Sequence, residues 1–132
     1  MNITADTNFL ISSTQWNYSV AHKLLQKLIR NKFEIFTTKD ILEEFANVLN
    51  RDFQYNQSEI ENILSKVMQF ATIITPKIKV QVIKDDPDDD KVIECALESE
   101  SKYIITYDKH LLKLGKYKGI KIITPEEAIL IL

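Results

Sequence analysis

The sequence has few of the residues that usually interrupt or cross-link a chain. It contains two glycines, three prolines and one cysteine in 132 residues. A single cysteine cannot form an internal disulfide bond, and no glycine-rich, serine-rich or repeated stretch divides the chain. No charged and then apolar leader precedes Ile3. We therefore expect one domain over residues 1–132 and a cytoplasmic location.

Long apolar runs and an excess of positive charge are also missing. The longest apolar stretches, such as residues 128–132, are far shorter than the roughly 20 residues of a membrane-spanning helix. A formal net charge of −2 argues against a protein that coats DNA through bulk positive charge. Five lysines gather in the last quarter of the chain, as phosphate contacts or simply as solvated residues. They are Lys109, Lys113, Lys116, Lys118 and Lys121.

Segments with strand character alternate with segments of helical periodicity along the chain. Strands are predicted at residues 2–5, 33–37, 71–75, 102–106 and 121–124. Helices are predicted at residues 8–13, 19–31, 39–51, 88–100 and 109–114, with others that open at Ser58, through a capping box with Glu61, and at Pro125. Residues 77–83 alternate in polarity and are read as an extended connection or edge. Strands separated by helices pair in parallel, which predicts an α/β fold: a three-layer α/β/α sandwich around a mainly parallel five-stranded sheet.

Acidic residues follow the predicted strands. Asp6 ends the first strand and Asp108 lies just past the fourth, so both carboxylates reach the edge where the carboxyl ends of the strands meet. Glu43 and Glu44 lie about one turn into the helix after the second strand. Glu44 shares a helical stripe with Ile41, which predicts that its side chain points toward the packed side.

A run of aspartates at residues 85–90 precedes the helix that leads into the fourth strand. The run brings one of its carboxylates to the same edge if that helix crosses the sheet at the right angle. Aspartate is also a routine cap of turns and helices. We expect Asp85, Asp86, Asp88 and Asp90 to be structural.

Carboxylates that share one pocket need cations or protons. Two of them about 4 Å apart repel by roughly 4 kcal/mol at an effective dielectric constant of about 20. Hard oxygen ligands suit Mg²⁺ or Mn²⁺, whereas zinc favours His or Cys, and the chain supplies only His22, His110 and Cys95. Such a site supports cleavage of a phosphodiester by a cation-activated water.

Four segments together resemble the PIN domain, the fold of many bacterial and archaeal toxin ribonucleases and of some eukaryotic RNA-processing nucleases. The segments are Ala5-Asp6-Thr7-Asn8-Phe9-Leu10, residues 41–49 (ILEEFANVL), residues 86–96 (DPDDDKVIECA) and residues 104–112 (IITYDKHLL). The resemblance covers nearly the whole chain. It implies an endoribonuclease that depends on Mg²⁺ or Mn²⁺, with RNA as substrate. The toxin branch of the family further implies a cognate antitoxin and a homodimer.

The resemblance also implies roles for individual residues. The metal ligands would be Asp6, Glu44, Asp89 and Asp108, with Thr106 and Asn8 as polar supports. Glu44 is preferred to Glu43 because the family's acid lies five residues before the leucine matched by Leu49. Asp89 is preferred to Asp90 because the family often has asparagine at the position of Asp90.

The chain departs from many similar family members in two places. Tyr107 stands where they have glycine, and His110 where they have an acid. His110 is either a phosphate contact or a surface histidine. Trp16 and Tyr18 are candidates for base stacking, or for core or partner contacts.

Other functions remain in view. They are an RNA-processing PIN nuclease outside a toxin–antitoxin pair, and a catalytically inactive PIN-fold interaction protein. A phosphatase with Asp6 as nucleophile would need a second aspartate where Asn8 stands. A dinucleotide-binding module would need glycine in the first turn, which has none.

Overall fold

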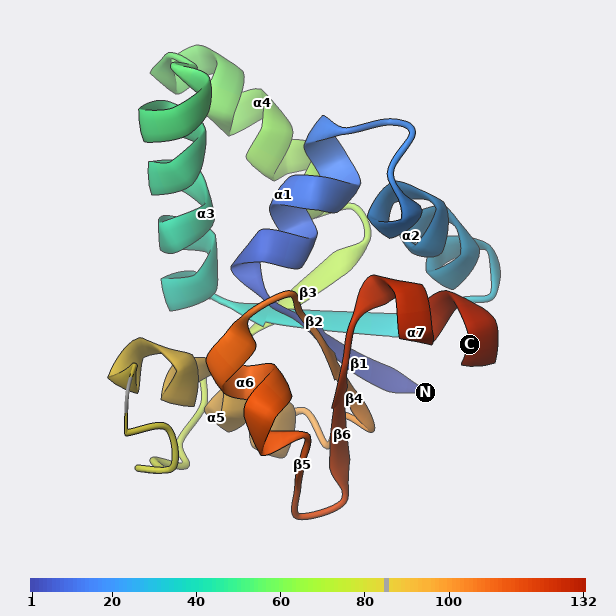
Figure 1. Ribbon diagram of the computed structural model, residues 1–132. Helices are drawn as coiled ribbons and strands as arrows, with labels where there is room; N and C mark the ends of the chain where they lie inside the picture. Colours follow the sequence, from blue (N-terminus) through green and yellow to red (C-terminus); the bar gives the residue numbers. More distant parts are fainter. Residues whose placement is uncertain (85) are drawn as a thin grey trace.

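The computed structural model describes residues 1–84 and 86–132. It has a central sheet with helices on both faces (Figure 1). Within these residues the strands are β1 (Asn2–Ala5), β2 (Glu34–Thr38), β3 (Ala71–Ile74), β4 (Tyr103–Ile105), β5 (Lys116–Tyr117) and β6 (Ile120–Ile123). Their order in the sheet is β3-β2-β1-β4-β6-β5, and every pair except β5 with β6 is parallel. The predicted α/β sandwich is confirmed.

All five predicted strands are present, and β5 is an unpredicted sixth. It forms a hairpin with β6 through a turn at Lys118 and Gly119, where φ is 47° and 85°. Positive φ at both central residues is the geometry of the tight turns that join antiparallel strands. Lysine before glycine is a weak signal for such a turn, which explains why the short strand escapes prediction.

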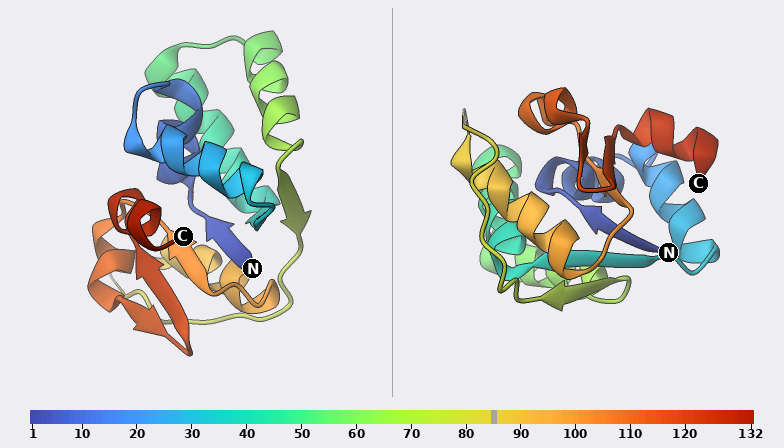
Figure 2. Two further views of the ribbon diagram at one scale, coloured as in Figure 1. Left: turned by 90° about the vertical axis from the view of Figure 1, so that its right-hand side faces the viewer. Right: turned by 90° about the horizontal axis from the view of Figure 1, so that it is seen from below.

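Helices cover the sheet on both sides. Their bounds are α1 (Thr7–Gln15), α2 (Val20–Arg30), α3 (Lys39–Phe53), α4 (Gln57–Val67), α5 (Asp90–Glu98), α6 (Lys109–Leu114) and α7 (Pro125–Ile131), and a 3₁₀ turn, η1, spans Pro87–Asp89. Helices α1 and α2 lie on one face of the sheet and α5 on the other, where it contacts β1, β2 and β4 (Figures 1 and 2). The large side chains of Phe9 and Phe45 are fully buried in the core.

Helices α2, α3 and α7 begin within one residue of their predicted starts, but the capping box predicted for α4 is not the one that forms. Ser19, Thr38 and Thr124 accept backbone N–H bonds at the starts of α2, α3 and α7. The prediction that Ser58 and Glu61 form a capping box is wrong, because Asn56 and Glu59 form it two residues earlier. Either pair satisfies the sequence pattern, since asparagine caps helices about as well as serine.

The connection at residues 77–83 is extended but belongs to no strand, as predicted. Its backbone N–H groups instead donate to acidic side chains of α5. The N–H groups of Val82 and Ile83 both donate to one oxygen of Asp90 over 2.9 Å. The N–H of Val80 donates to Glu94 over 3.0 Å, and the N–H of Lys77 donates to Glu98. These contacts hold the connection against α5, close to the start of the helix at Asp90.

Among the described residues, no helix combines the length and apolar character that a membrane crossing requires.

Candidate metal centre

Asp6 lies at the junction between β1 and α1, where it caps the helix. Its Oδ1 accepts the N–H of Thr7 over 2.7 Å, and its Oδ2 accepts the hydroxyl of Thr106 over 2.7 Å. The side chain is buried, which raises its pKa to about 6 although both hydrogen bonds lower it. The charges of Glu44 and Asp108 add to the rise. Two hydrogen bonds therefore fix the orientation of the Asp6 carboxyl group, while burial and neighbouring charges disfavour its ionised form.

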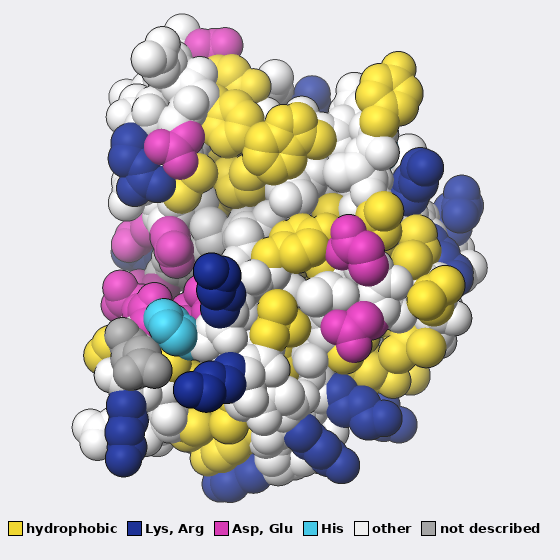
Figure 3. Space-filling model, viewed as in Figure 1, with side chains coloured by type: hydrophobic (Ala, Val, Ile, Leu, Met, Phe, Trp, Pro, Cys, Tyr) yellow, Lys and Arg dark blue, Asp and Glu magenta, His cyan; other side chains and the backbone are white. Residues whose placement is uncertain are grey.

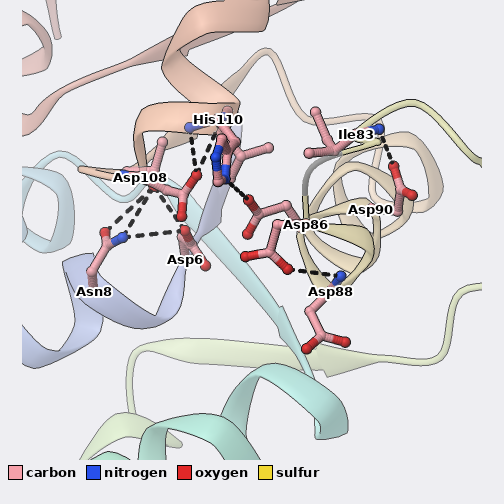
Figure 4. A network of polar contacts seen from close by, with 11 residues as sticks. Asp6, Asn8, Ile83, Asp86, Asp88, Asp90, Asp108 and His110 are labelled. Carbon is pink, nitrogen blue, oxygen red and sulfur yellow. Dashed lines mark hydrogen bonds and ion pairs between the residues drawn. The ribbon is translucent and has the colours of Figure 1, made fainter.

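Asp108 reaches the same edge from β4 through a short polar network. The hydroxyl of Thr106 accepts the N–H of Asp108 over 2.9 Å, while Asn8 Oδ1 accepts the N–H of Tyr107 over 2.8 Å. Asp108 Oδ1 caps α6 by accepting the N–H of His110 over 2.8 Å. Thr106 thus hydrogen-bonds to both Asp6 and the backbone of Asp108, and Asn8 lies beside Asp6 (Figure 4).

Asp89 approaches from the other side of the cavity, on the η1 turn. It is 8% exposed, and its Oδ2 has no hydrogen-bond partner among the residues that the structure describes. Burial, the carboxyl group of Asp108 and the charges of Asp86 and Asp6 together raise its pKa to about 8, with burial the largest cause. An oxygen so placed needs a proton or a cation.

Glu44 completes the set from α3. Its Oε2 accepts the hydroxyl of Thr7 over 3.2 Å, which directs the carboxylate toward Asp6. The prediction that Glu44 points toward the packed side is wrong: the side chain is exposed at the mouth of the cavity. Glu43 lies outside this cavity and forms an exposed ion pair with Lys39 over 3.9 Å.

The four acids implied by the resemblance line one cavity of about 430 Å³. Its lining residues are Asp6, Thr7, Asn8, Ile11, Ser12, Trp16, Glu44, Val48, Asp86, Asp88, Asp89, Tyr107 and Asp108. This lining contains six acids and, within the described chain, no lysine or arginine. Acidic side chains gather beside a histidine on this face of the molecule (Figure 3).

The remaining aspartates of the run differ in their roles. Asp90 is structural, as predicted, because it is buried and holds the connection before η1. Asp86 Oδ1 caps η1, yet Asp86 also lines the cavity together with Asp88. Asp85 lies outside the described residues.

Sequence reasoning did not assign Asp86 or His110 to this cluster. Ligand atoms of Asp86, Asp89, Asp108 and His110 all lie within 4.8 Å of one another. The available signal was the place of His110, two residues after Asp108, where similar family members carry an acid.

The two aromatic candidates lie in different environments. Trp16 lines the cavity and packs on Phe53, with 5.7 Å between the ring centroids. Tyr18 is 94% exposed and does not line the cavity.

The residues present fit a divalent cation such as Mg²⁺ or Mn²⁺. Crowded carboxylates with raised pKa values are the donors that hard cations take, and one of them has a buried oxygen without a hydrogen-bond partner in the described part of the chain. Such a cluster without lysine or arginine is poorly suited to holding an anion directly. The arrangement can bind cations and, through them, a phosphate.

A family comparison agrees with this geometry. The family described as PIN domain matches residues 2–110, and the chain belongs to that family. No curated protein matches the chain. The fold is similar to that in the crystal structure of VapBC2 from Rickettsia felis bound to a DNA fragment from their promoter, with a TM-score of 0.68. The match covers 94% of this chain and 98% of that chain at 12% sequence identity, which shows a shared fold.

Proposed function

We propose that this chain is an endoribonuclease that depends on Mg²⁺ or Mn²⁺ and acts as the toxin of a toxin–antitoxin pair. The observation that carries the proposal is the buried Oδ2 of Asp89, which has no hydrogen-bond partner among the described residues and lies in a cavity with Asp6, Glu44 and Asp108. Membership of the PIN family and the fold shared with VapBC2 from Rickettsia felis support the nuclease activity and the toxin role respectively.

The proposed metal ligands are Asp6, Asp89 and Asp108, with Glu44 helping to hold the same cation or a second one. A divalent cation held there would supply the Lewis acidity needed for in-line attack of water on an RNA phosphate, and its charge would offset that on the leaving oxygen. The chain's own contribution is to hold the carboxylates charged and oriented. Thr106 does this for Asp6 through its hydroxyl, and the first turn of α6 does it for Asp108.

Substrate entry requires that the acidic cavity be neutralised first. Six acids without a cation would repel an RNA phosphate at contact distance. Lys91 lies at the adjoining cavity beside Glu44, where its ammonium group is 3.8 Å from Asp88. A cationic side chain at this rim can contact the RNA backbone while the carboxylates hold the metal.

Asp6→Asn tests the activity with Asp52→Asn as its matched control. Asp52 is also an aspartate, but it is exposed and pairs with Arg51 at the end of α3. We expect Mn²⁺-dependent cleavage of labelled RNA by the wild-type and Asp52→Asn proteins, none in EDTA, and a loss of at least about 100-fold in Asp6→Asn. Circular dichroism checks that each variant is folded.

Two results would decide against the proposal. Full activity of Asp6→Asn would show that the assigned site is wrong or that a contaminating nuclease is present. Inactivity of the pure wild-type protein on RNA with either metal would favour the interaction-protein alternative. Labelled DNA in the same assay distinguishes the substrate class.

We further propose partners and a setting that follow from the toxin role. They are a cognate antitoxin that occludes the cavity, a homodimer, a cytoplasmic location and a single domain over residues 1–132. A small open reading frame that overlaps the upstream end of this one would support the antitoxin. Copurification of its product with this chain, and relief of RNA cleavage on its removal, would test it directly.

A further inference from the structure

We infer that His110 supplies a nitrogen ligand to a divalent cation held with Asp89 and Asp108. One cation position in the cavity would then have mixed oxygen and nitrogen donors in place of carboxylates alone. The inference deepens the proposed function and rests on it in one respect, that the cavity binds divalent cations.

The spacing of the donor atoms matches a single coordination sphere. Ligand atoms of Asp86, Asp89, Asp108 and His110 lie within 4.8 Å of one another. Bonds of about 2.1 Å place opposite ligands of one cation roughly 4.2 Å apart, and adjacent ligands closer. Small side-chain movements therefore bring these atoms onto one ion. The side chain of His110, at 42% exposure, has the room to make them.

The contact between His110 and Asp89 favours a shared ion over a direct bond. Nδ1 of His110 lies 3.8 Å from Oδ2 of Asp89, which is too far for a hydrogen bond. That oxygen is buried, has no hydrogen-bond partner among the described residues, and faces the histidine. A separation of 3.8 Å between Nδ1 and Oδ2 is compatible with both atoms binding one metal ion between them.

The backbone of α6 fixes His110 relative to Asp108. The N–H of His110 donates to Oδ1 of Asp108 over 2.8 Å, so the two residues share the first turn of the helix. Figure 4 shows the side chains of Asp108, His110 and Asp86 converging on the same space, while Asp90 points away toward Ile83. His110 therefore occupies the place from which an acid two residues after Asp108 would act.

A nitrogen ligand changes which cation the site prefers. Mg²⁺ takes oxygen ligands almost alone, whereas imidazole suits transition metals. We expect His110 to shift the preference from Mg²⁺ toward Mn²⁺ and later transition ions. His110→Asp, which restores an all-oxygen set, should shift it back toward Mg²⁺.

The chain allows a clean spectroscopic test because it has two histidines, His22 and His110. The ring of His22 contacts the carbonyl of Ser13 over 2.7 Å and lines a different cavity, so His22→Gln is the matched control for His110→Gln. Mn²⁺ is bound to untagged protein, and electron spin echo modulation reports imidazole nitrogen coupled to the metal. Calorimetry measures Mn²⁺ and Mg²⁺ affinity, and circular dichroism checks folding.

We expect imidazole nitrogen coupling in the wild-type protein and in His22→Gln, and its loss in His110→Gln. We also expect Mn²⁺ affinity to fall about tenfold in His110→Gln, with a smaller change for Mg²⁺. His110→Asp should bind Mn²⁺ without nitrogen coupling, which keeps the test valid if His110→Gln is poorly folded.

The outcomes separate this inference from the proposed function. Mn²⁺ bound to the wild-type protein without nitrogen coupling would overturn the ligand role of His110 and leave the proposed nuclease standing. Coupling that persists in His110→Gln would overturn it as well. Failure of the wild-type protein to bind either metal would overturn both.

Discussion

The hydroxyl of Thr106 donates a hydrogen bond of 2.7 Å to the carboxylate of Asp6, one hundred residues earlier in the chain. The same hydroxyl accepts the N–H of Asp108 over 2.9 Å. One buried side chain thus links the ends of two neighbouring parallel strands and sets the separation of two proposed metal ligands. Its bond to Asp6 also lowers the pKa of a carboxyl group that burial raises.

Thr106→Val removes this hydroxyl while keeping the shape of the side chain. We expect metal affinity to fall by about tenfold, as is common when a group that orients a ligand is lost. The pKa of Asp6 should rise further, because a hydrogen bond that favours the charged form is gone. Thr106→Ser retains the hydroxyl and is the control. Calorimetric titration with Mn²⁺ measures the affinity, and equal affinity in both variants would contradict the positioning role.

Glu44 and its neighbour Glu43 provide a matched pair on α3. Glu44 lines the cavity with Asp6, whereas Glu43 lies outside it in an exposed ion pair with Lys39. We expect Glu44→Gln to lower kcat for RNA cleavage by at least about tenfold, because it removes a charge that helps to hold the cation. Glu43→Gln should be nearly as active as the wild-type protein. A larger loss of kcat in Glu43→Gln than in Glu44→Gln would show that Glu43, and not Glu44, is the acid of the site.

Asp89 and Asp90 are adjacent, but we expect their loss to affect different properties. Asp89→Asn should abolish activity and raise the stability of the metal-free protein at neutral pH. Folding at that pH must protonate a carboxyl group that is ionised in the unfolded chain, and asparagine avoids this cost. Asp90→Ala leaves the N–H groups of Val82 and Ile83 without their acceptor, which should cost about 1–3 kcal/mol of unfolding free energy.

Urea denaturation and RNA cleavage, measured on both variants, separate these effects. Activity per folded molecule should survive in Asp90→Ala. A stable but inactive Asp90→Ala protein would contradict the structural role of that residue.

The stability of the metal-free protein should fall as the pH rises. Asp6 and Asp89 have their pKa raised on folding, to about 6 and about 8 from the ordinary value of 3.8. The folded state therefore binds more protons than the unfolded state above that ordinary value. Each group lowers the unfolding free energy by up to about 1.4 kcal/mol per pH unit until its folded pKa is passed.

Thermal unfolding in EDTA between pH 4 and about 8 measures this effect. Excess Mn²⁺ should restore stability at the upper end, since a ligand that binds only the folded state stabilises it. Asp89→Asn should flatten the profile above about pH 6, where Asp89 alone of the two still titrates. A stability that rises over this range in EDTA would contradict the raised pKa values.

Topology explains which parts of the site the sequence could predict. Asp6 and Asp108 follow strands that pair in parallel, β1 and β4, so their meeting depends only on strand order. The inward placement of Asp89, with Asp90 facing the other way, depends on the angle of a short 3₁₀ turn, which residue spacing does not specify. The same turn brings Asp86 to the cavity, where sequence reasoning expected only a cap.

Other differences arise where local signals compete. Two capping patterns overlap at the start of α4, at Asn56 with Glu59 and at Ser58 with Glu61, and helix propensity alone does not choose between them. Helical periodicity predicted that Glu44 points inward. At that level of α3 the adjoining space is the cavity and not the core, so the side chain is exposed.

The attachment of residues 77–83 to α5 has a consequence for which substitutions the chain tolerates. Backbone amides make these bonds to acids spaced four residues apart on the helix, at Asp90, Glu94 and Glu98. Exchanging the exposed side chains at positions 77, 79 and 81 leaves every donor in place. Proline at 77, 80, 82 or 83 would delete a donor. This stretch is thus free to diverge among related chains at its exposed positions, while the acids on the helix are not.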